Sequence, residues 1–220
     1  MSRITEKKDV QDALVNYLIG IGWEYLPPDE IMALRGGDER EPFLLPIVKE
    51  QLIALNPGLV SEANVDELLR RLRGLLPNMD GNEAFLHYLR GHRTVYCEAD
   101  RRERNLTLLD YDNPTHNHLA FTQEFLFVDR DRRRADMVLF VNGFPVVLIE
   151  NKSPTSVDAE LEAFDQVQHT YADRIPELQV RPVLCCLRPQ DSLRRHLERQ
   201  PQGVLLLEGG RQGLWAGAAQ

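Results

Sequence analysis

The chain has 220 residues, a formal net charge of −8, and hydrophobic and charged fractions of 43% and 27%, which are ordinary for a soluble globular protein. This length allows one substantial core and at most two small domains. No apolar run is long enough to span a membrane, and the N-terminus lacks the apolar region of a signal peptide. Three cysteines without disulfide or zinc spacing indicate buried thiols in a reducing cytoplasm. The acidic balance argues against tight, autonomous binding to DNA.

The first part of the chain is expected to be helical. Residues 6–21 carry apolar side chains at helical spacing after Thr5, a favourable N-cap, and Gly22 ends this predicted helix. Residues 28–91 contain three further apolar stripes, separated by segments rich in proline or glycine. The charges between the stripes are typical of a solvated face, so we expect this helical segment to have a structural role.

From residue 94 onward the apolar period changes to two, which predicts strands over residues 94–97, 105–111 and 119–128. The polar loop before the third strand contains His116 and His118, whose spacing would allow metal binding. Residues that hold a turn are the favoured interpretation, because no cysteine or third histidine accompanies them.

The densest basic cluster of the chain follows the third predicted strand. Two interpretations of it remain open: a site for a phosphate backbone, and a solvated β-turn. The cluster consists of Arg130, Arg132, Arg133 and Arg134.

Two short apolar runs flank Asn142-Gly143, and together they give a strong signal for a hairpin of buried strands. Asp136, Glu150 and Lys152 lie at the open end of this hairpin. Burying charge near a core is costly unless the charge is paired or holds a metal. These three residues therefore require an explanation.

The register of the hairpin decides whether the two acids meet. A two-residue loop at Asn142-Gly143 would pair Asp136 with Ile149 and so place Asp136 on the opposite sheet face from Glu150. The hairpin should therefore contain an odd register or a bulge, because a slip of one residue moves every side chain to the other face.

One arrangement that satisfies this condition is a three-residue loop, with Gly143 in a left-handed bulge position. It pairs Phe140 with Phe144 and sets Asp136 against Leu148. Asp136, Glu150 and Lys152 then share one face. Two converging carboxylates suit a hard cation such as Mg²⁺, and a nearby lysine can orient water for attack on a phosphodiester.

Beyond the hairpin, helical spacing predicts a helix over residues 156–171, followed by a strand over 180–187. A short helix over 193–198 and a last strand over 203–207 are also expected. No P-loop motif for ATP occurs in the sequence.

The spacing Asp-x13-Glu-x-Lys of Asp136, Glu150 and Lys152 resembles the PD-(D/E)xK nuclease motif. The residues around it resemble the N-terminal nuclease domain of type I restriction enzyme R subunits, whose pattern runs R-P-D through F-V-N-G-L-P to E-L-K. This chain departs from that pattern at Ala135 and Asn151, which leaves the two acids and the lysine intact. The resemblance covers about residues 4–187.

The resemblance implies an α/β (α+β) fold of the restriction-endonuclease type, with a mixed central sheet flanked by helices and a helical insert over residues 28–91. A single nuclease domain would occupy residues 1–200, and residues 201–220 would form a C-terminal tail. Members of this family carry a helicase-like motor downstream, so the chain is expected to be a module of a longer protein. ATP would be used only by that motor.

The resemblance also assigns roles to individual residues. Asp136 and Glu150 would hold Mg²⁺ together with the carbonyl of Asn151, and Lys152 would act in catalysis. The family's Gln-x3-Tyr motif is one residue longer here, so either Gln166 or Gln168 would act with Tyr171 as auxiliary residues. Glu6 is a further auxiliary candidate, although an acid in the first turn of a helix also simply complements the helix dipole.

The implied function is that of a Mg²⁺-dependent endonuclease domain acting on double-stranded DNA, in a cytoplasmic complex with methyltransferase and specificity subunits. Two alternatives remain: a stand-alone nuclease or resolvase in repair or defence, and a non-catalytic module that docks on a methyltransferase. The intact Asp136, Glu150 and Lys152 set argues against the docking module, because a scaffold has no need of buried charges.

Overall fold

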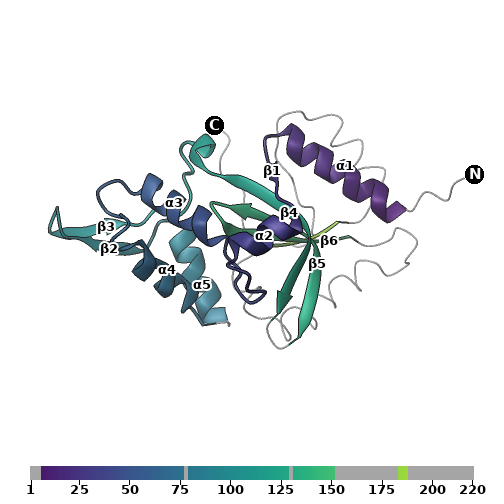
Figure 1. Cartoon of the computed structure of the whole chain (residues 1–220). Coiled ribbons are helices and arrows are strands. Elements are labelled where there is room, and N and C mark those ends of the chain that lie inside the picture. The colour runs from purple at the N-terminus through teal and green to yellow at the C-terminus, as the bar shows by residue number, and fades with distance from the viewer. Residues whose placement is uncertain (1–5, 77–78, 129–130, 152–182, 188–220) are drawn as a thin grey trace, which may run out of the picture.

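The computed structural model describes residues 6–76, 79–128, 131–151 and 183–187 (Figure 1). Helices predominate up to residue 89 and strands follow, as the change of apolar period predicts. In chain order the elements are α1 (Glu6–Gly20), β1 (Glu24–Tyr25), α2 (Pro28–Leu34), α3 (Leu45–Leu55), α4 (Val65–Arg73), α5 (Met79–Leu89), β2 (Thr94–Cys97), β3 (Arg102–Asn105), the 3-10 turn η1 (Pro114–His116), β4 (Leu119–Val128), β5 (Arg132–Val141), β6 (Phe144–Asn151) and β7 (Val183–Leu187).

The main sheet has five strands in the order β1-β4-β5-β6-β7. Its centre is an antiparallel meander of β4, β5 and β6, and the two outer strands, β1 and β7, run parallel to their neighbours. The sheet is therefore mixed, as expected. The connection between β6 and β7 runs through residues 152–182, so the helix predicted over 156–171 lies outside the described residues.

Helices cover both faces of this sheet because the inner strands are apolar on both sides. On one face, Leu14 and Leu18 of α1 pack against Met137 and Leu139 of β5. On the other face, α2 and the chain before α3 cover a cluster that includes Val138 of β5. The prediction of a mixed sheet flanked by helices is confirmed.

A second core joins helices α3, α4 and α5 to the tip of the β5–β6 hairpin. The rings of Phe43, Phe85 and Phe144 meet at its centre, with centroids 5.1–6.3 Å apart. The antiparallel pair β2–β3 belongs to this part of the molecule and projects away from the main sheet in Figure 1. The prediction of helices within residues 28–91 is thus confirmed.

The strand predicted over residues 105–111 is wrong. Its period of two is genuine, because Leu106 and Leu108 are both buried, but only Asn105, the last residue of β3, pairs with a strand, and residues 106–111 belong to none. The side chain of Asn56 takes the place of a neighbouring strand: its Oδ1 accepts from the N–H of Thr107 and its Nδ2 donates to the carbonyl of Thr107, both at 2.8 Å. The alternation of apolar residues therefore indicates burial in this segment, and not pairing within a sheet.

The edge of β4 that faces away from β5 is covered by the loop that follows α2. Arg35 is fully buried there, and it donates to the backbone carbonyls of Glu39, Glu41 and Leu126. Covering an edge in this way leaves no row of free strand groups for another chain to pair with. Among the described residues, no helix is long and apolar enough to cross a membrane.

Candidate active site

The β5–β6 hairpin turns through two residues, Asn142 and Gly143, with φ angles of 53° and 78°. Positive φ at both positions is the signature of a type I′ turn, which matches the twist of the flanking strands. Val141 accordingly pairs with Phe144. The three-residue loop considered from the sequence is therefore wrong.

The register shift that the sequence predicts is nevertheless present, a few residues further along the hairpin. Phe140 pairs with Pro145 but Leu139 pairs with Val147, so Val146 is an extra residue in β6. The bulge directly follows Pro145, which has no N–H to give to a ladder and is tolerated at such irregular positions. Every later pair in the hairpin is displaced by one residue.

The displaced register brings the two acidic positions together. Met137 pairs with Ile149, so the next step of the same register would set Asp136 opposite Glu150. Opposite positions of an antiparallel pair lie on one face of the sheet. The arrangement in which Asp136 faces Ile149, which would have excluded a shared site, does not occur.

The surroundings of Asp136 are those of an interior strand. Its side chain is 6% exposed, and its chain neighbours Ala135 and Met137 are buried in two different apolar clusters. Glu150 and Asn151 pair on their other side with Cys186 and Leu187 of β7, so β6 is held between two strands at this level. Rigid elements of this kind position ligands more accurately than loops do.

An irregularity of β4 lies beside Asp136. Gln123 pairs with Met137 and Phe125 with Ala135, which leaves Glu124 at the position opposite Asp136. Glu124 has a φ of 55°, and a left-handed backbone costs a residue with a side chain about 1–2 kcal/mol. Backbone strain of this kind is concentrated at functional sites.

At this point the apolar side chains of β4 and β5 switch from one face of the sheet to the other. On β4, Ala120 and Phe125 belong to the same apolar cluster although they are five positions apart, which in a regular strand would place them on opposite faces. On β5, Ala135 and Val138 do the same. Strict alternation, on which the sequence prediction relied, is therefore broken at the level of Glu124 and Asp136.

The described arginines of the basic cluster all have acidic partners. Arg132 makes two contacts with Glu39, from Nε at 2.9 Å and from Nη2 at 2.6 Å. Arg133 lies 3.3 Å from Asp131, and Arg134 places Nε 2.6 Å from Oε2 of Glu124. Hydrogen bonding to Arg132 lowers the pKa of the Glu39 carboxyl. Arg130 lies outside the described residues.

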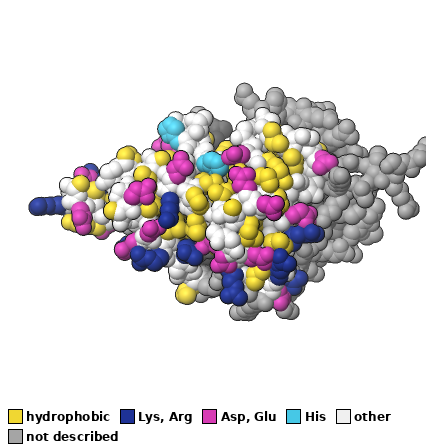
Figure 2. Space-filling view, in the orientation of Figure 1, with side chains coloured by type: hydrophobic (Ala, Val, Ile, Leu, Met, Phe, Trp, Pro, Cys, Tyr) yellow, Lys and Arg dark blue, Asp and Glu magenta, His cyan; other side chains and the backbone are white. Residues whose placement is uncertain are grey.

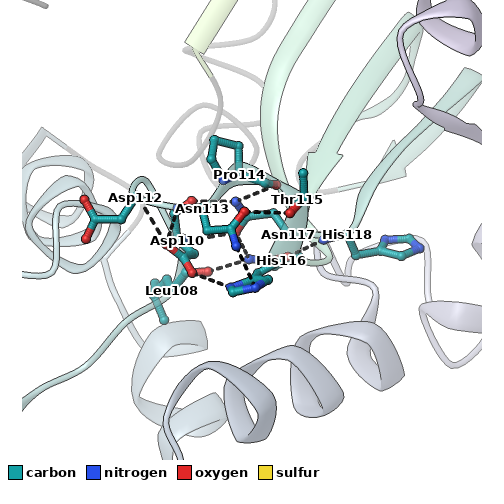
Figure 3. A network of polar contacts seen from close by, with 10 residues as sticks. Leu108, Asp110, Asp112, Asn113, Pro114, Thr115, His116, Asn117 and His118 are labelled. Atoms are coloured by element: carbon teal, nitrogen blue, oxygen red, sulfur yellow. Dashed lines mark hydrogen bonds and ion pairs between the residues drawn. The ribbon is translucent and has the colours of Figure 1, made fainter.

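His116 and His118 contact different residues. In Figure 3, His116 is part of a polar network in which its Nδ1 lies 2.8 Å from Asp110 and its Nε2 lies 2.8 Å from Asn113. His118 instead places Nε2 2.8 Å from Glu24 of β1. Within the described part of the chain, no group of three His, Cys, Asp or Glu side chains is placed to hold a metal. The turn-holding interpretation of His116 fits this geometry.

The same network holds the hairpin turn in place. The fully buried Asn142 donates from Nδ2 to the carbonyl of Leu108 and to Oδ1 of Asn117, both at 2.8 Å. Its own Oδ1 accepts from the backbone N–H of His118 at 2.7 Å. The Asn-Gly signal therefore identifies a turn that is fixed by the loop before β4.

Oxygen donors are what this site offers to a cofactor. Asp136 lies on β5, and Glu150 and Asn151 end β6, and carboxylate and carbonyl oxygens are the donors that a hard cation such as Mg²⁺ prefers. Lys152 directly follows β6 and lies outside the described residues, as do Gln166, Gln168 and Tyr171. Glu6 is the first residue of α1.

Two residues with a part in this region were missed from the sequence. Arg35 is buried with its guanidinium carbon 4.4 Å from the ring centroid of Phe125, and burial lowers the pKa of its guanidinium to about 10. Nothing in the sequence around Arg35 indicated that this residue would be buried. Glu124 had a signal, because Thr122-Gln123-Glu124 places three polar residues in succession within a strand that otherwise alternates.

Comparison with known proteins bears on what this site does. The sequence model of the family described as type I restriction enzyme R protein N terminus matches residues 3–181. The HindI endonuclease subunit of a type I restriction enzyme from Haemophilus influenzae is 29% identical over 184 residues, which is 78% of this chain and 17% of that protein. A protein of Methanocaldococcus jannaschii, assigned as the MjaIXP endonuclease subunit of a type I restriction enzyme, is 26% identical over 188 residues, which is 80% of this chain and 18% of that protein.

The chain thus spans less than a fifth of the length of these relatives, and the match to the family covers most of the chain. The resemblance inferred from residues 134–152 is confirmed. This chain belongs to the family of type I restriction enzyme R protein N-terminal domains.

Proposed function

We propose that this chain is a Mg²⁺-dependent DNA endonuclease domain of a type I restriction enzyme. The observation that carries the proposal is the register shift at Val146, because the displaced register would set Asp136 opposite Glu150. Glu150 directly precedes Asn151 and stands two residues before Lys152. The names of the relatives, which are endonuclease subunits, support the same chemistry.

Each residue of the proposed site would have its own role in cleavage. Asp136, Glu150 and the carbonyl of Asn151 would hold the cation, because hard oxygen donors suit it. Bound Mg²⁺ would supply positive charge at the phosphodiester and lower the pKa of a water molecule. The Lys152 ammonium would orient that water and offset negative charge that develops on the phosphate.

Auxiliary residues would complete the site. Gln166 or Gln168, together with Tyr171, would support the catalytic groups or contact DNA, and Glu6 at the start of α1 is a further candidate. These roles rest on the family resemblance.

Delivery to DNA would depend on other parts of the enzyme. The net charge is −8, and the described arginines near Asp136 are paired with carboxylates. In Figure 2, basic and acidic side chains are interspersed on the face shown, without a broad basic area. A downstream ATP-dependent motor and the methyltransferase and specificity subunits would bring unmodified double-stranded DNA to the site.

Nicking of supercoiled plasmid DNA by a large excess of this chain tests the proposal. Nicking should require Mg²⁺ or Mn²⁺, should stop in EDTA, and should be lost in Lys152→Ala. Efficient cutting at low protein concentration without partners or ATP would favour a stand-alone nuclease. A wild-type chain that does not nick in either metal would leave the docking module as the better description.

A further inference from the structure

Glu124 is a third acidic residue at the level of the candidate metal site. The β4–β5 ladder skips Glu124 and Asp136, which lie between the pairs Gln123–Met137 and Phe125–Ala135, and the β5–β6 register, continued by one step from Met137–Ile149, would set Asp136 opposite Glu150. The three acidic positions therefore form a row across three neighbouring strands. Glu124 is also the one residue of the described main sheet with a positive φ, at 55°.

Glu124 is engaged by an arginine from the adjacent strand. Its Oε2 lies 2.6 Å from Nε of Arg134, which stands two residues before Asp136 on β5. The two side chains are 41% and 61% exposed, but Oε2 of Glu124 is itself buried and meets Arg134 as an ion pair, without the geometry of a hydrogen bond.

The chemistry of arginine suits a phosphate at this place. A guanidinium carries five N–H donors in a planar fork, which matches the geometry of a phosphate. A DNA strand whose phosphate reaches the Asp136 site must also bring neighbouring phosphates close to residue 134. An arginine that is already oriented loses less conformational entropy when it binds.

We infer that Glu124 is a positioning residue, which holds the Arg134 guanidinium beside Asp136 so that it binds a DNA phosphate next to the bond that is cut. This inference rests on the nuclease function proposed above. Glu124 itself would touch neither DNA nor the cation, and it would act only through Arg134.

Single-turnover cleavage of plasmid DNA in Mg²⁺ tests this coupling, with the wild-type chain, Glu124→Gln, Arg134→Gln and the double variant. Each single change should lower the cleavage rate constant by about 10-fold or more. The double variant should be no slower than Arg134→Gln alone, because the acid acts through the arginine. Arg134→Lys should not restore the rate, since lysine lacks the planar fork.

Two comparisons separate positioning from other effects. DNA affinity measured in Ca²⁺ should not weaken in Glu124→Gln, because that change removes a negative charge from the surface that DNA approaches. The matched control is the ion pair of Glu67 and Arg71 on α4, also 2.6 Å long, where the same substitutions should leave cleavage unchanged. If Glu124→Gln does not fold, Glu124→Asn replaces it, because asparagine tolerates a left-handed backbone.

Additive effects of the two changes would overturn the inference, and so would an unchanged or faster rate in Glu124→Gln. A faster rate would mean that the acid merely repels DNA. If the wild-type chain cuts and the coupling is absent, only the inference fails. If the wild-type chain cuts in neither Mg²⁺ nor Mn²⁺, the proposed function fails first.

Discussion

A single extra residue in β6, Val146, shifts the register of the neighbouring strand so that Asp136 would stand opposite Glu150 and not opposite Ile149. The shift matters because one residue of slip exchanges the two faces of a strand. At the level of Asp136, Glu124 adopts a left-handed backbone. The apolar side chains of β4 and β5 also switch there from one face of the sheet to the other. The irregularity of β4 thus lies at the level of the proposed catalytic carboxylate, and the bulge of β6 lies nearer the hairpin turn.

The change Asp136→Asn keeps the size of this side chain and removes its charge. We expect plasmid cleavage in Mg²⁺ to fall by about 100-fold or more, as when one group that stabilises the transition state is lost. The free energy of unfolding without metal should change little or rise, because a carboxylate at a position opposite two other acids is neutralised.

Asp66→Asn is the matched control for this prediction, because Asp66 is an exposed acid of α4 that is paired with Lys49. Cleavage by that variant should equal that of the wild-type chain. Cleavage at the wild-type rate by Asp136→Asn would remove Asp136 from the mechanism.

At the scale of elements, the hairpin turn is the part most tightly fixed by its surroundings. Gly143 has a φ of 78°, and its carbonyl accepts from the N–H of Leu44, the residue before α3, at 2.9 Å. A Cβ at this position would lie 2.7 Å from Cγ2 of Val48 and 2.9 Å from the carbonyl oxygen of Leu44. The turn and α3 therefore leave no room for a side chain.

Gly143→Ala should destabilise the protein by roughly 2–4 kcal/mol, the sum of left-handed strain and a steric clash with backbone. Gly37→Ala is a close control, because Gly37 has the same φ of 78° with nothing within 4 Å of its added Cβ. That variant should lose only about 1–2 kcal/mol. Equal losses in urea unfolding would show that the contact with α3 is not tight.

The loop before β4 should give the stability of the protein a dependence on acid pH. Hydrogen bonds from the N–H of Asn113 and from the ring of His116 hold the pKa of Asp110 below its usual 3.8. A carboxyl whose pKa is lower in the folded state stabilises that state above the unfolded pKa. This stabilisation is lost as the pH falls through the folded pKa.

Asp110→Asn should therefore show a smaller loss of stability than the wild-type chain when the pH falls from neutrality to below about 3.8. Urea unfolding at a series of pH values measures this difference. Asp112→Asn, in the same exposed loop, is the control. An identical pH profile for Asp110→Asn and the wild-type chain would show that the network does not favour the charged carboxylate.

For the whole molecule, the sequence predicted the elements whose apolar period is long and regular. The strand over residues 119–128 has the predicted bounds, and the need for a register shift followed from the charges at the hairpin ends. The sequence could not reveal that Asn56 replaces a strand beside Thr107, because that contact joins residues 51 positions apart. The left-handed backbone of Glu124 likewise depends on its place in the folded sheet.

The charge distribution of the whole chain predicts weak binding to DNA. With a net charge of −8 and few arginines near the site, the isolated chain should bind a duplex with a dissociation constant of about 1 µM or weaker at roughly 150 mM salt. The affinity should fall further as salt is raised. A gel-shift titration measures both, and nanomolar binding by this chain alone would argue against dependence on partner subunits.

The most direct test of the account is the position of a divalent cation in crystals of this chain soaked with Mn²⁺. Anomalous diffraction should show a peak about 2.0–2.6 Å from carboxylate oxygens of both Asp136 and Glu150. The peak should disappear in Asp136→Asn. Saturating Mn²⁺ that binds elsewhere, with no peak between β5 and β6, would contradict the proposed metal-dependent nuclease centre.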